Sequence, residues 1–415
     1  MRRLGDIPLR EAIVPLLFIG GVTADFSPLS VHLSLLVSDV CLIAAGVISL
    51  PYALAQAPQA FLRFLESHRS FLVAAVLGVL FLVGTGLSTL LAGAPRAGVE
   101  TWLLFALLVG LVVPLTALAT AHSDIARRWL GRGLLLGATI GSLGFVGKAV
   151  TGSAPSYGFR SSGLFGSDPL LLIIVGLTIV LTRIGSRLRA PERRLQPILL
   201  LELVLVGLFV AALAVSRYRA GWVAAIAAVL WVTALYARSL KVFAAVAFAL
   251  VAVGVTSYKL SILPDTVQTR IEQSFDSSQP DFFARREVAK RLLWVWTQEP
   301  WGIGLNESVR YVPPVFASGR VDSIHNFVAN GLVEGGPLAA LPLAVFPFLL
   351  TAMWLRRHPQ HHRPWERTWG IAALWPAFIA AQFATSLYQH AAWIAVGAAL
   401  GASVRHVGEA RVDTP

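Results

Sequence analysis

Apolar residues along the chain occur in long runs that are separated by polar connections. A helix needs about 20 apolar residues to cross the hydrocarbon core of a bilayer, and twelve segments approach that length. The segments lie at residues 12–24, 29–50, 71–91, 102–120, 133–150, 169–181, 198–215, 222–236, 242–255, 327–355, 369–383 and 391–404. The pattern predicts an all-α polytopic membrane protein with about twelve transmembrane helices.

The composition agrees with this fold class. Of the 415 residues, 56% are hydrophobic and only 13% are charged, whereas a soluble domain is about 25% charged. A soluble enzyme, a nucleic-acid-binding module and a disordered chain are therefore excluded. The one cysteine, Cys41, excludes a disulfide framework and a metal site built from cysteines.

Basic residues in the connections predict the orientation of the helices. Of the 34 cationic residues, 21 lie at the two termini and in the connections on the same side of the predicted bundle. Cytoplasmic loops carry the excess of lysine and arginine, so we expect both termini to be cytoplasmic. The net charge of +12 then indicates cytoplasmic loops close to anionic lipid, with no need for a nucleic-acid partner.

One connection is far longer than the others. Residues 258–324 separate the ninth apolar segment from the tenth, and they carry eight cations on the expected periplasmic side. Within them, Asp281 is an expected N-cap of an amphipathic helix that ends before Pro300, with a flexible turn at Gly302-Ile303-Gly304. The expected apolar stripe of this helix consists of Ala289, Leu292, Leu293 and Trp296. The chain is thus predicted to divide into residues 1–257 with nine transmembrane helices, a periplasmic loop domain at 258–325, and residues 326–415 with three more helices and a short tail.

The cations of that helix allow two interpretations. Arg285, Arg286, Lys290 and Arg291 lie mostly off its apolar stripe. One interpretation is an amphipathic helix on the membrane surface, with its arginines on lipid headgroups. The other is a site for an anionic substrate.

Three stretches of the sequence together resemble the O-antigen ligase and polymerase superfamily of membrane glycosyltransferases. The first is the turn at 159–166, with Arg160, and the second is the turn at 216–221, with Arg217. The third runs from Arg285 through residues 300–305 to His325-Asn326 and Glu334-Gly335. The sequence departs from the family pattern at Asp168-Pro169, after the first turn, and at Gly336-Pro337.

The resemblance implies a function and a set of site residues. The expected reaction transfers O-antigen polysaccharide from undecaprenyl diphosphate to a sugar hydroxyl of lipid A–core, at the periplasmic face of a Gram-negative inner membrane. Neither a metal nor a cofactor is expected. The resemblance assigns Arg217 and Arg285 to the diphosphate and His325 to the acceptor, with Arg286 as the alternative to Arg285. Arg160, Arg219, Arg286 and Asn326 are the expected substrate-binding residues, although a structural turn at Arg160 and a headgroup contact at Arg219 remain open.

These residue types suit the expected chemistry. The planar guanidinium of arginine binds phosphate through two parallel hydrogen bonds and stays charged at any relevant pH. The predicted outer loops contain no close pair of aspartates that would hold a metal for the same purpose. A neutral imidazole can take the proton of the attacking hydroxyl. Direct attack opposite the diphosphate inverts the configuration at the anomeric carbon.

Other functions remain open at this point. A polymerase would join repeat units on the same lipid carrier, and a related enzyme would glycosylate a protein. A transporter should concentrate ionisable groups near the middle of the bilayer, but the unusual charges here gather at one face. Asp39 and Glu202 are the expected intramembrane acids, and such residues are candidates for a function. For Glu202, pairing with an arginine of the preceding connection is the structural alternative. His390, near the last outer turn, is a minor alternative to His325. The expected partners are the lipid-linked glycan donor, the lipid A–core acceptor and membrane lipids.

Overall fold

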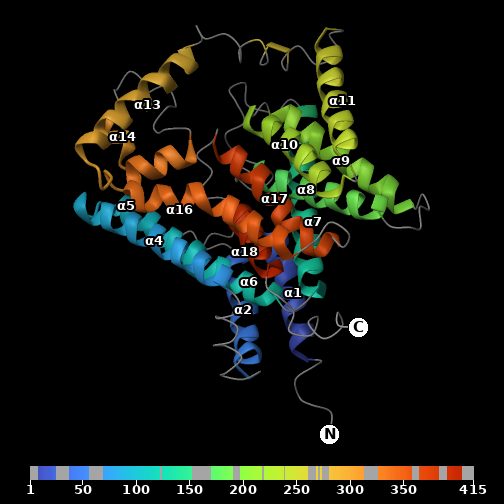
Figure 1. The fold of residues 1–415 in the computed structure, drawn as a ribbon, viewed down its shortest axis with the longest axis horizontal. Coiled ribbons are helices and arrows are strands. Elements are labelled where there is room, and N and C mark those ends of the chain that lie inside the picture. Colours follow the sequence, from blue (N-terminus) through green and yellow to red (C-terminus); the bar gives the residue numbers. More distant parts are fainter. Residues whose placement is uncertain are drawn as a thin grey trace.

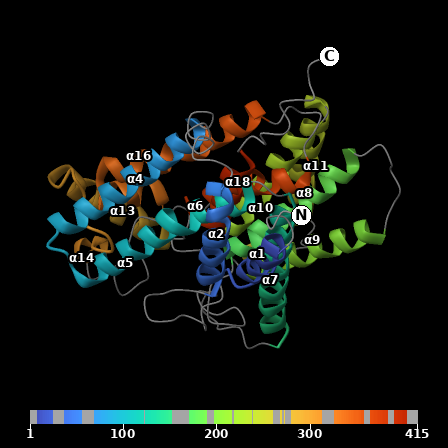
Figure 2. The ribbon, with the colours of Figure 1, turned by 90° about the horizontal axis from the view of Figure 1, so that it is seen from below.

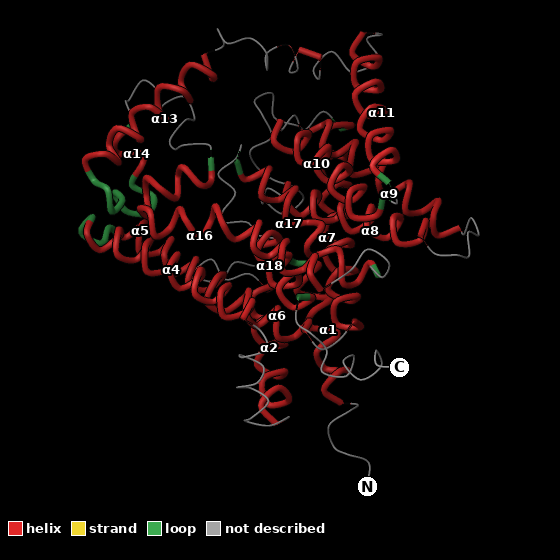
Figure 3. The backbone as a smooth tube through the Cα atoms, in the orientation of Figure 1, coloured by secondary structure: helices red, strands yellow, loops and turns green. Residues whose placement is uncertain are grey.

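The computed structural model describes residues 8–24, 37–55, 69–121, 124–151, 170–189, 197–216, 219–237, 239–259, 268–269, 272, 280–312, 326–357, 364–382 and 390–403. Every regular element in these residues is a helix (Figure 3). The helices that form the bundle up to the long connection are α1 (Pro8–Val22), α2 (Val37–Ala55), α4 (Arg69–Leu91), α5 (Arg96–Leu107), the π-helical turn η2 (Leu108–Val112), α6 (Val113–Ala121), α7 (Asp124–Val150), α8 (Leu170–Arg189), α9 (Pro197–Ser216), α10 (Arg219–Tyr236) and α11 (Leu240–Lys259). They are followed by α13 (Pro280–Gln298), α14 (Ser308–Tyr311), α16 (Phe327–Arg357), α17 (Trp365–Ala381) and α18 (His390–Ala402).

The helices confirm an all-helical membrane protein. Each of the twelve predicted apolar segments contains a helix. Within the described residues, seven helices are long and apolar enough to cross a membrane, and four more apolar helices are shorter. The prediction of twelve crossings with both termini cytoplasmic stays a prediction.

The helix α8 lies at the centre of the bundle. Its residues from Leu170 to Val180 are almost completely buried, and it packs against α7, α9, α10 and α17. An uninterrupted apolar sequence such as Leu170-Leu171-Leu172-Ile173-Ile174-Val175 suits a helix that is surrounded by protein on every side.

Small residues allow other helices to approach closely. The backbone of Gly133 in α7 lies against Phe18 of α1, so that a Cβ atom at Gly133 would collide with the Phe18 carbonyl oxygen. Interfaces of this kind are common between membrane helices, where van der Waals packing replaces the hydrophobic effect as the main attraction.

One end of the bundle is held by ion pairs. Glu202 of α9 is buried and pairs with Arg183 at 2.9 Å and Arg187 at 3.2 Å, both near the end of α8. The predicted pairing of Glu202 is therefore confirmed, with arginines of the preceding helix as its partners. Asp124 of α7 likewise pairs with Arg367 of α17 at 2.9 Å. Because arginines dominate this end, it corresponds to the side that the charge distribution predicts to be cytoplasmic.

The helix α16 is broken near its start. Gly336 has φ 71° and ψ −174°, which is not a helical conformation, so residues 327–335 and 337–357 form two helical segments. Gly336 accepts this positive φ because it has no Cβ, and a Cβ there would also lie 2.6 Å from the Trp301 carbonyl oxygen. The two segments fold back on each other, since a Cβ at Gly331 in the first would meet Leu343 in the second at 2.7 Å. The predicted single tenth crossing is thus a short helical segment followed by a helix of spanning length.

The long connection packs against one end of this hairpin. In Figures 1 and 2, α13 and α14 lie beside α16 and the start of α5, whereas α11 stands apart from them. Contacts of α13 with both α16 and α14 support the same arrangement. The basic helix of the long connection is therefore attached to the segment that follows His325-Asn326 in sequence.

Candidate active site

The helix α13 is amphipathic, and protein covers its apolar face. Its buried residues Val288, Leu292 and Val295 form a cluster with Val333 of α16 and Ile303 of the following loop. The predicted stripe was right at Leu292, and Ala289 and Trp296 are partly buried against the same cluster, but it was wrong at Leu293, which is exposed. It missed Val288 and Val295, because helical spacing alone does not show which of two adjacent apolar rows meets a partner.

The cations of α13 lie outside this buried face. Arg285, Arg286, Lys290 and Arg291 are all exposed. Lys290 pairs with Glu287 at 2.8 Å, and the Arg291 guanidinium lies 4.8 Å from the centre of the Trp294 ring. The helix begins at Pro280, so Asp281 lies in its first turn and is not the predicted N-cap.

The Gly302-Ile303-Gly304 segment is buried against the broken part of α16, whereas the sequence predicts a flexible turn. The amide N–H of Ile303 donates to the Val333 carbonyl oxygen at 2.9 Å, and that of Gly304 donates to the Glu334 carbonyl oxygen at 3.1 Å. Gly302 and Gly304 have φ values of 97° and 94°, which only glycine adopts readily. The proline-x-glycine-x-glycine and glutamate-x-glycine stretches are therefore two halves of one packed structure.

A serine of α4 joins the same structure. The Ser88 hydroxyl accepts a hydrogen bond from the Gly304 N–H at 2.8 Å and donates to the Glu334 carbonyl oxygen. A Cβ at Gly302 would lie 2.5 Å from the Ser88 oxygen, so this position has no room for a side chain. The loop after α13 is thereby fixed to α4 as well as to α16.

The carboxylate of Glu334 is the centre of this packing. It is buried, and the Ser308 hydroxyl donates to it at 2.6 Å. The backbone N–H groups of Asn306 and Ser308 and the Asn330 side chain are polar neighbours of this carboxylate. A buried carboxylate among polar groups holds its neighbours in a defined geometry, because the Ser308 hydroxyl would lose its partner if the loop moved away. We call the set of Ser88, the 302–308 loop and Glu334 the loop anchor.

The loop anchor determines the direction in which α13 runs. The helix α13 ends at Gln298. Within the next six residues, the N–H groups of Ile303 and Gly304 bond to the end of the first segment of α16. The carboxyl ends of these two helical segments therefore meet. Their amino-terminal turns, with Arg285 and Arg286 on α13 and Asn326 before α16, consequently lie toward the same end.

The amino-terminal turn of α16 is capped by Asn326. The Asn326 Oδ1 atom accepts a hydrogen bond from the Ala329 N–H at 2.9 Å. This is a typical N-cap contact, and it satisfies one of the amide groups that a helix start leaves without a partner. His325 directly precedes this cap in sequence.

Arg219, the first residue of α10, lies toward the same side of the bundle. Arg183 lies over the Trp365 ring at the start of α17, and Arg189 donates to the Tyr236 carbonyl oxygen at the end of α10. The end of α8 is thus close to the start of α17 and to the end of α10. The helices α10 and α17 therefore run antiparallel. The start of α10 then lies toward the other end of α17, where Phe378 packs edge-on against Phe327 of α16.

The described site residues are therefore on one side, opposite the arginine-rich end of α8. Arg219, Arg285, Arg286 and Asn326 all lie toward this side. Arg217, His325 and Arg160 lie outside the described residues, so their predicted roles rest on the sequence.

One comparison with known families matches part of the chain. Residues 203–344 match a family model described as O-antigen ligase. The chain carries an O-antigen ligase domain. This confirms the resemblance to the O-antigen ligase superfamily, whose family covers both ligases and polymerases and consists of glycosyltransferase-like enzymes. A search of curated proteins finds no match to the chain.

The O-antigen ligase domain extends from α9 into the second segment of α16. It contains Arg217, Arg219 and both helices α13 and α14, together with His325 and the Glu334 end of the loop anchor. Arg160 lies outside it, and so does Ser88, which is on α4. The domain is thus completed by a helix from the preceding part of the chain.

Sequence reasoning missed two arrangements. It quoted Glu334 for its place in a motif but gave it no role, and it had no signal for Ser88 or Ser308. It named Asp39 and His390 separately, yet the structure pairs them at 3.1 Å, both buried, between the starts of α2 and α18. Asp39 and His390 are far apart in sequence, so only the packing of α2 and α18 shows the pair. Within the described residues, no group of three histidine, cysteine or acidic side chains gathers as a metal site would.

Glu334→Gln is expected to weaken the loop anchor. The amide keeps the size of the carboxylate, but its NH₂ group cannot accept a hydrogen bond from the surrounding donors. A buried donor that loses its partner costs about 1–3 kcal/mol, so we expect a lower thermal unfolding temperature and faster proteolysis within residues 299–312. Purified protein in detergent micelles serves for both measurements. Glu299→Gln is the matched control, because Glu299 is exposed on the same segment. Equal stability of the two variants would contradict the role given to Glu334.

Proposed function

We propose that the protein is an inverting, metal-independent glycosyltransferase of the bacterial inner membrane. It moves O-antigen polysaccharide from undecaprenyl diphosphate to a sugar hydroxyl of lipid A–core at the periplasmic face. The observation that carries this proposal is the O-antigen ligase domain at residues 203–344. The loop anchor supports it, since it joins the motif stretches of that domain into one packed structure.

The reaction requires one displacement. The acceptor oxygen forms a bond to the anomeric carbon of the donor sugar, and the bond from that carbon to the diphosphate oxygen breaks with its electron pair on the diphosphate. The acceptor proton passes to the imidazole of His325. Attack from the side opposite the diphosphate inverts the anomeric configuration.

The leaving diphosphate gains negative charge as its bond breaks. We assign Arg217 and Arg285 to this charge, with Arg286 as the alternative to Arg285 and with Arg160 and Arg219 as further contacts to the donor. The exposure of Arg285 and Arg286 supports their access to a lipid headgroup. Preorganised donors aimed at a developing charge supply a large part of the rate enhancement in many enzymes.

The start of α16 suits the same polar region. A helix N-terminus carries partial positive charge and favours nearby anions. Asn326 caps this terminus, and His325 precedes it in sequence. The acceptor hydroxyl and the donor diphosphate would therefore meet near the amino-terminal turns of α13 and α16, which lie toward the same end.

A polymerase on the same lipid carrier is the second candidate, because the matched family covers both activities. It would use the same residues with a growing polymer as the acceptor or donor. The two candidates differ in which acceptor is joined to the glycan, so the products in a cell distinguish them.

Gel analysis of lipopolysaccharide from a deletion strain tests the proposal. We expect core without attached polymer, while polymer continues to accumulate on the carrier lipid. Reintroduction of the wild-type chain should restore the polymer ladder. Core that carries a single repeat unit would instead identify a polymerase, and an unchanged ladder would rule out both activities.

A further inference from the structure

Arginines outnumber carboxylates where the helices α7, α8 and α17 pack against one another. Four arginines and two carboxylates gather at the end of the bundle that is expected to be cytoplasmic, namely Arg128, Arg132, Arg183, Arg187, Glu202 and Glu366. We call the four arginines the arginine cluster. Within the described residues, this group of side chains carries a surplus of two positive charges.

The carboxylates near the arginine cluster already have partners. Glu366 pairs with Arg128 at 2.8 Å, and the two arginines of α8 share Glu202. The nearby Asp124 is likewise shared by two arginines outside the cluster. Among the described residues, Arg132 is left without a carboxylate partner, and its guanidinium instead lies over an aromatic ring.

Like charges face one another inside the cluster. Both Arg132 and Arg187 repel the Arg183 guanidinium. The Arg183 side chain is only 19% exposed, so water screens this repulsion less than it would at an open surface. Arginine cannot relieve the repulsion by losing its proton. An anion between the guanidinium groups would relieve it, because each of them would then face an opposite charge.

Two tryptophans place the cluster at the depth of lipid headgroups. The Arg132 guanidinium lies 4.9 Å from the centre of the Trp129 ring, and that of Arg183 lies 5.3 Å from the centre of the Trp365 ring. Tryptophan is enriched at the interface between membrane and water. Arg132 is also eight residues beyond the start of α7, or about 12 Å at 1.5 Å per residue, so the cluster lies deeper than the helix end.

An exposed apolar face of α7 continues from the cluster. Leu136 and Leu143 follow Arg132 at helical spacing and are exposed, as Arg132 is. A lipid whose headgroup meets Arg132 can therefore lay an acyl chain along the same side of the helix. Inorganic phosphate would make no use of this face.

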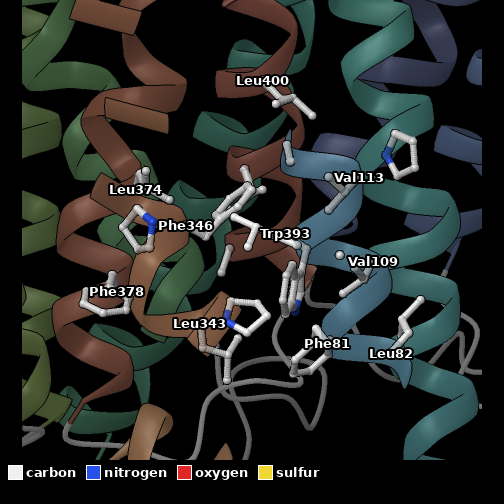
Figure 4. A pocket seen from close by; sticks show the side chains of 18 of the residues that line it. Phe81, Leu82, Val109, Val113, Leu343, Phe346, Leu374, Phe378, Trp393 and Leu400 are labelled. Atoms are coloured by element: carbon white, nitrogen blue, oxygen red, sulfur yellow. The ribbon is translucent and has the colours of Figure 1, made fainter. Parts of the chain in front are cut away.

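The apolar cavity between α4, η2, α16, α17 and α18 is unsuited to a phosphate (Figure 4). Every residue that lines it is glycine, proline or a hydrophobic residue, including Leu374 and Phe378 of α17. A buried charge without a partner is costly, so an anionic headgroup would avoid this cavity. The arginine cluster, at the other end of α17, offers the opposite environment.

We propose that the arginine cluster binds the headgroup of an anionic phospholipid, with an acyl chain along the exposed face of α7. Basic pockets between transmembrane helices on the cytoplasmic side suit such headgroups. Cardiolipin fits best, because its two phosphates match the surplus of two positive charges in the described residues. The inference does not rest on the proposed function, so its test needs no glycan substrate.

Lipid titration of the purified full-length protein tests the inference. The protein is stripped of lipid in detergent micelles, and its thermal unfolding and its native mass spectrum are then measured with each added compound. Cardiolipin should stay bound and raise the unfolding temperature by about 3 °C near saturation, because a ligand of the folded state stabilises it. Phosphatidylethanolamine and inorganic phosphate should do neither.

Arg132→Gln is the decisive variant. It should weaken cardiolipin binding about fivefold, the usual contribution of one basic residue near an anionic membrane surface. Arg132→Lys keeps the charge and should retain most of the affinity. Without lipid, Arg132→Gln should unfold no lower than the wild type, because it removes a repelled charge and leaves no carboxylate without a partner. A merely structural arginine would lower that temperature.

Arg96→Gln is the matched control. It removes the same charge from a 93% exposed side chain at the other end of the bundle, and it should bind cardiolipin as the wild type does. Equal cardiolipin affinities of Arg132→Gln and Arg96→Gln would overturn the inference, and so would equal retention of phosphatidylethanolamine. An equal rise in unfolding temperature with inorganic phosphate alone would show a site for a free anion and would overturn the assignment to a lipid.

Discussion

His325→Ala is expected to lower glycan transfer at least about a hundred-fold, since a positioned general base contributes roughly 10²–10⁴ in rate. The acceptor hydroxyl is a weak nucleophile at neutral pH, and the alanine side chain cannot take its proton. The protein should still insert and fold, because Asn326 and not His325 provides the observed cap of α16. Transfer from a lipid-linked glycan to a lipid A–core acceptor, followed with purified enzyme on gels, measures the effect.

Asn326→Ala is the control that distinguishes the loss of the general base His325 from damage to the start of α16. It removes the hydrogen bond to the Ala329 N–H, and loss of an N-cap costs about 1 kcal/mol. We expect Asn326→Ala to lower the unfolding temperature more than His325→Ala does, and to reduce transfer less. If His325→Ala retained transfer in well-folded protein, His325 would lose its assignment and His390, paired with Asp39, would be the histidine to test next.

Arg217→Lys is expected to reduce transfer about a hundred-fold even though the positive charge stays. Lysine binds phosphate as a point charge and lacks the planar fork that donates two parallel hydrogen bonds. Loss of one preorganised donor to a developing charge typically costs about 3 kcal/mol of barrier. Because the interaction strengthens as the diphosphate leaves, the loss should fall on kcat more than on KM.

Arg219→Lys is the matched comparison for Arg217→Lys. Arg219 begins α10, two residues further along the chain, and is only half-buried. Arg219 is proposed to contact the donor away from the leaving diphosphate, where either cation suffices, so we expect Arg219→Lys to change kcat by less than about threefold. Near-normal turnover of Arg217→Lys would show that Arg217 acts only through its charge. Equal losses in the two variants would contradict the special assignment of Arg217 to the leaving diphosphate.

Several features of the site could be predicted from sequence, and particular residues show why. Gly335, Gly336 and Pro337 are residue types that interrupt a helix, and Gly336 has the positive φ that makes the break in α16. The cations of α13 were expected off its apolar stripe, and they are exposed. These features depend on local chemistry, because a glycine or proline limits the backbone at its own position.

Other features could not be predicted in this way. Gly302 and Gly304 indicated a turn, but not that the turn is buried against Ser88 and Glu334. Leu293 and Val295 are both apolar, and only the position of α16 shows that Val295 is the buried one. In each case the partner is distant along the chain, and the sequence does not contain its distance or direction.

The sequence by itself determined that the chain is a helical membrane protein, where its apolar helices lie, and which stretches resemble the O-antigen ligase superfamily. These conclusions follow because a bilayer requires long apolar helices and because motifs are read from consecutive residues. The tertiary structure alone decided that the loop anchor aligns α13 with α16 and that Asp39 pairs with His390. Such features depend on how helices pack, and packing is set by the shapes of side chains that meet only after the chain has folded.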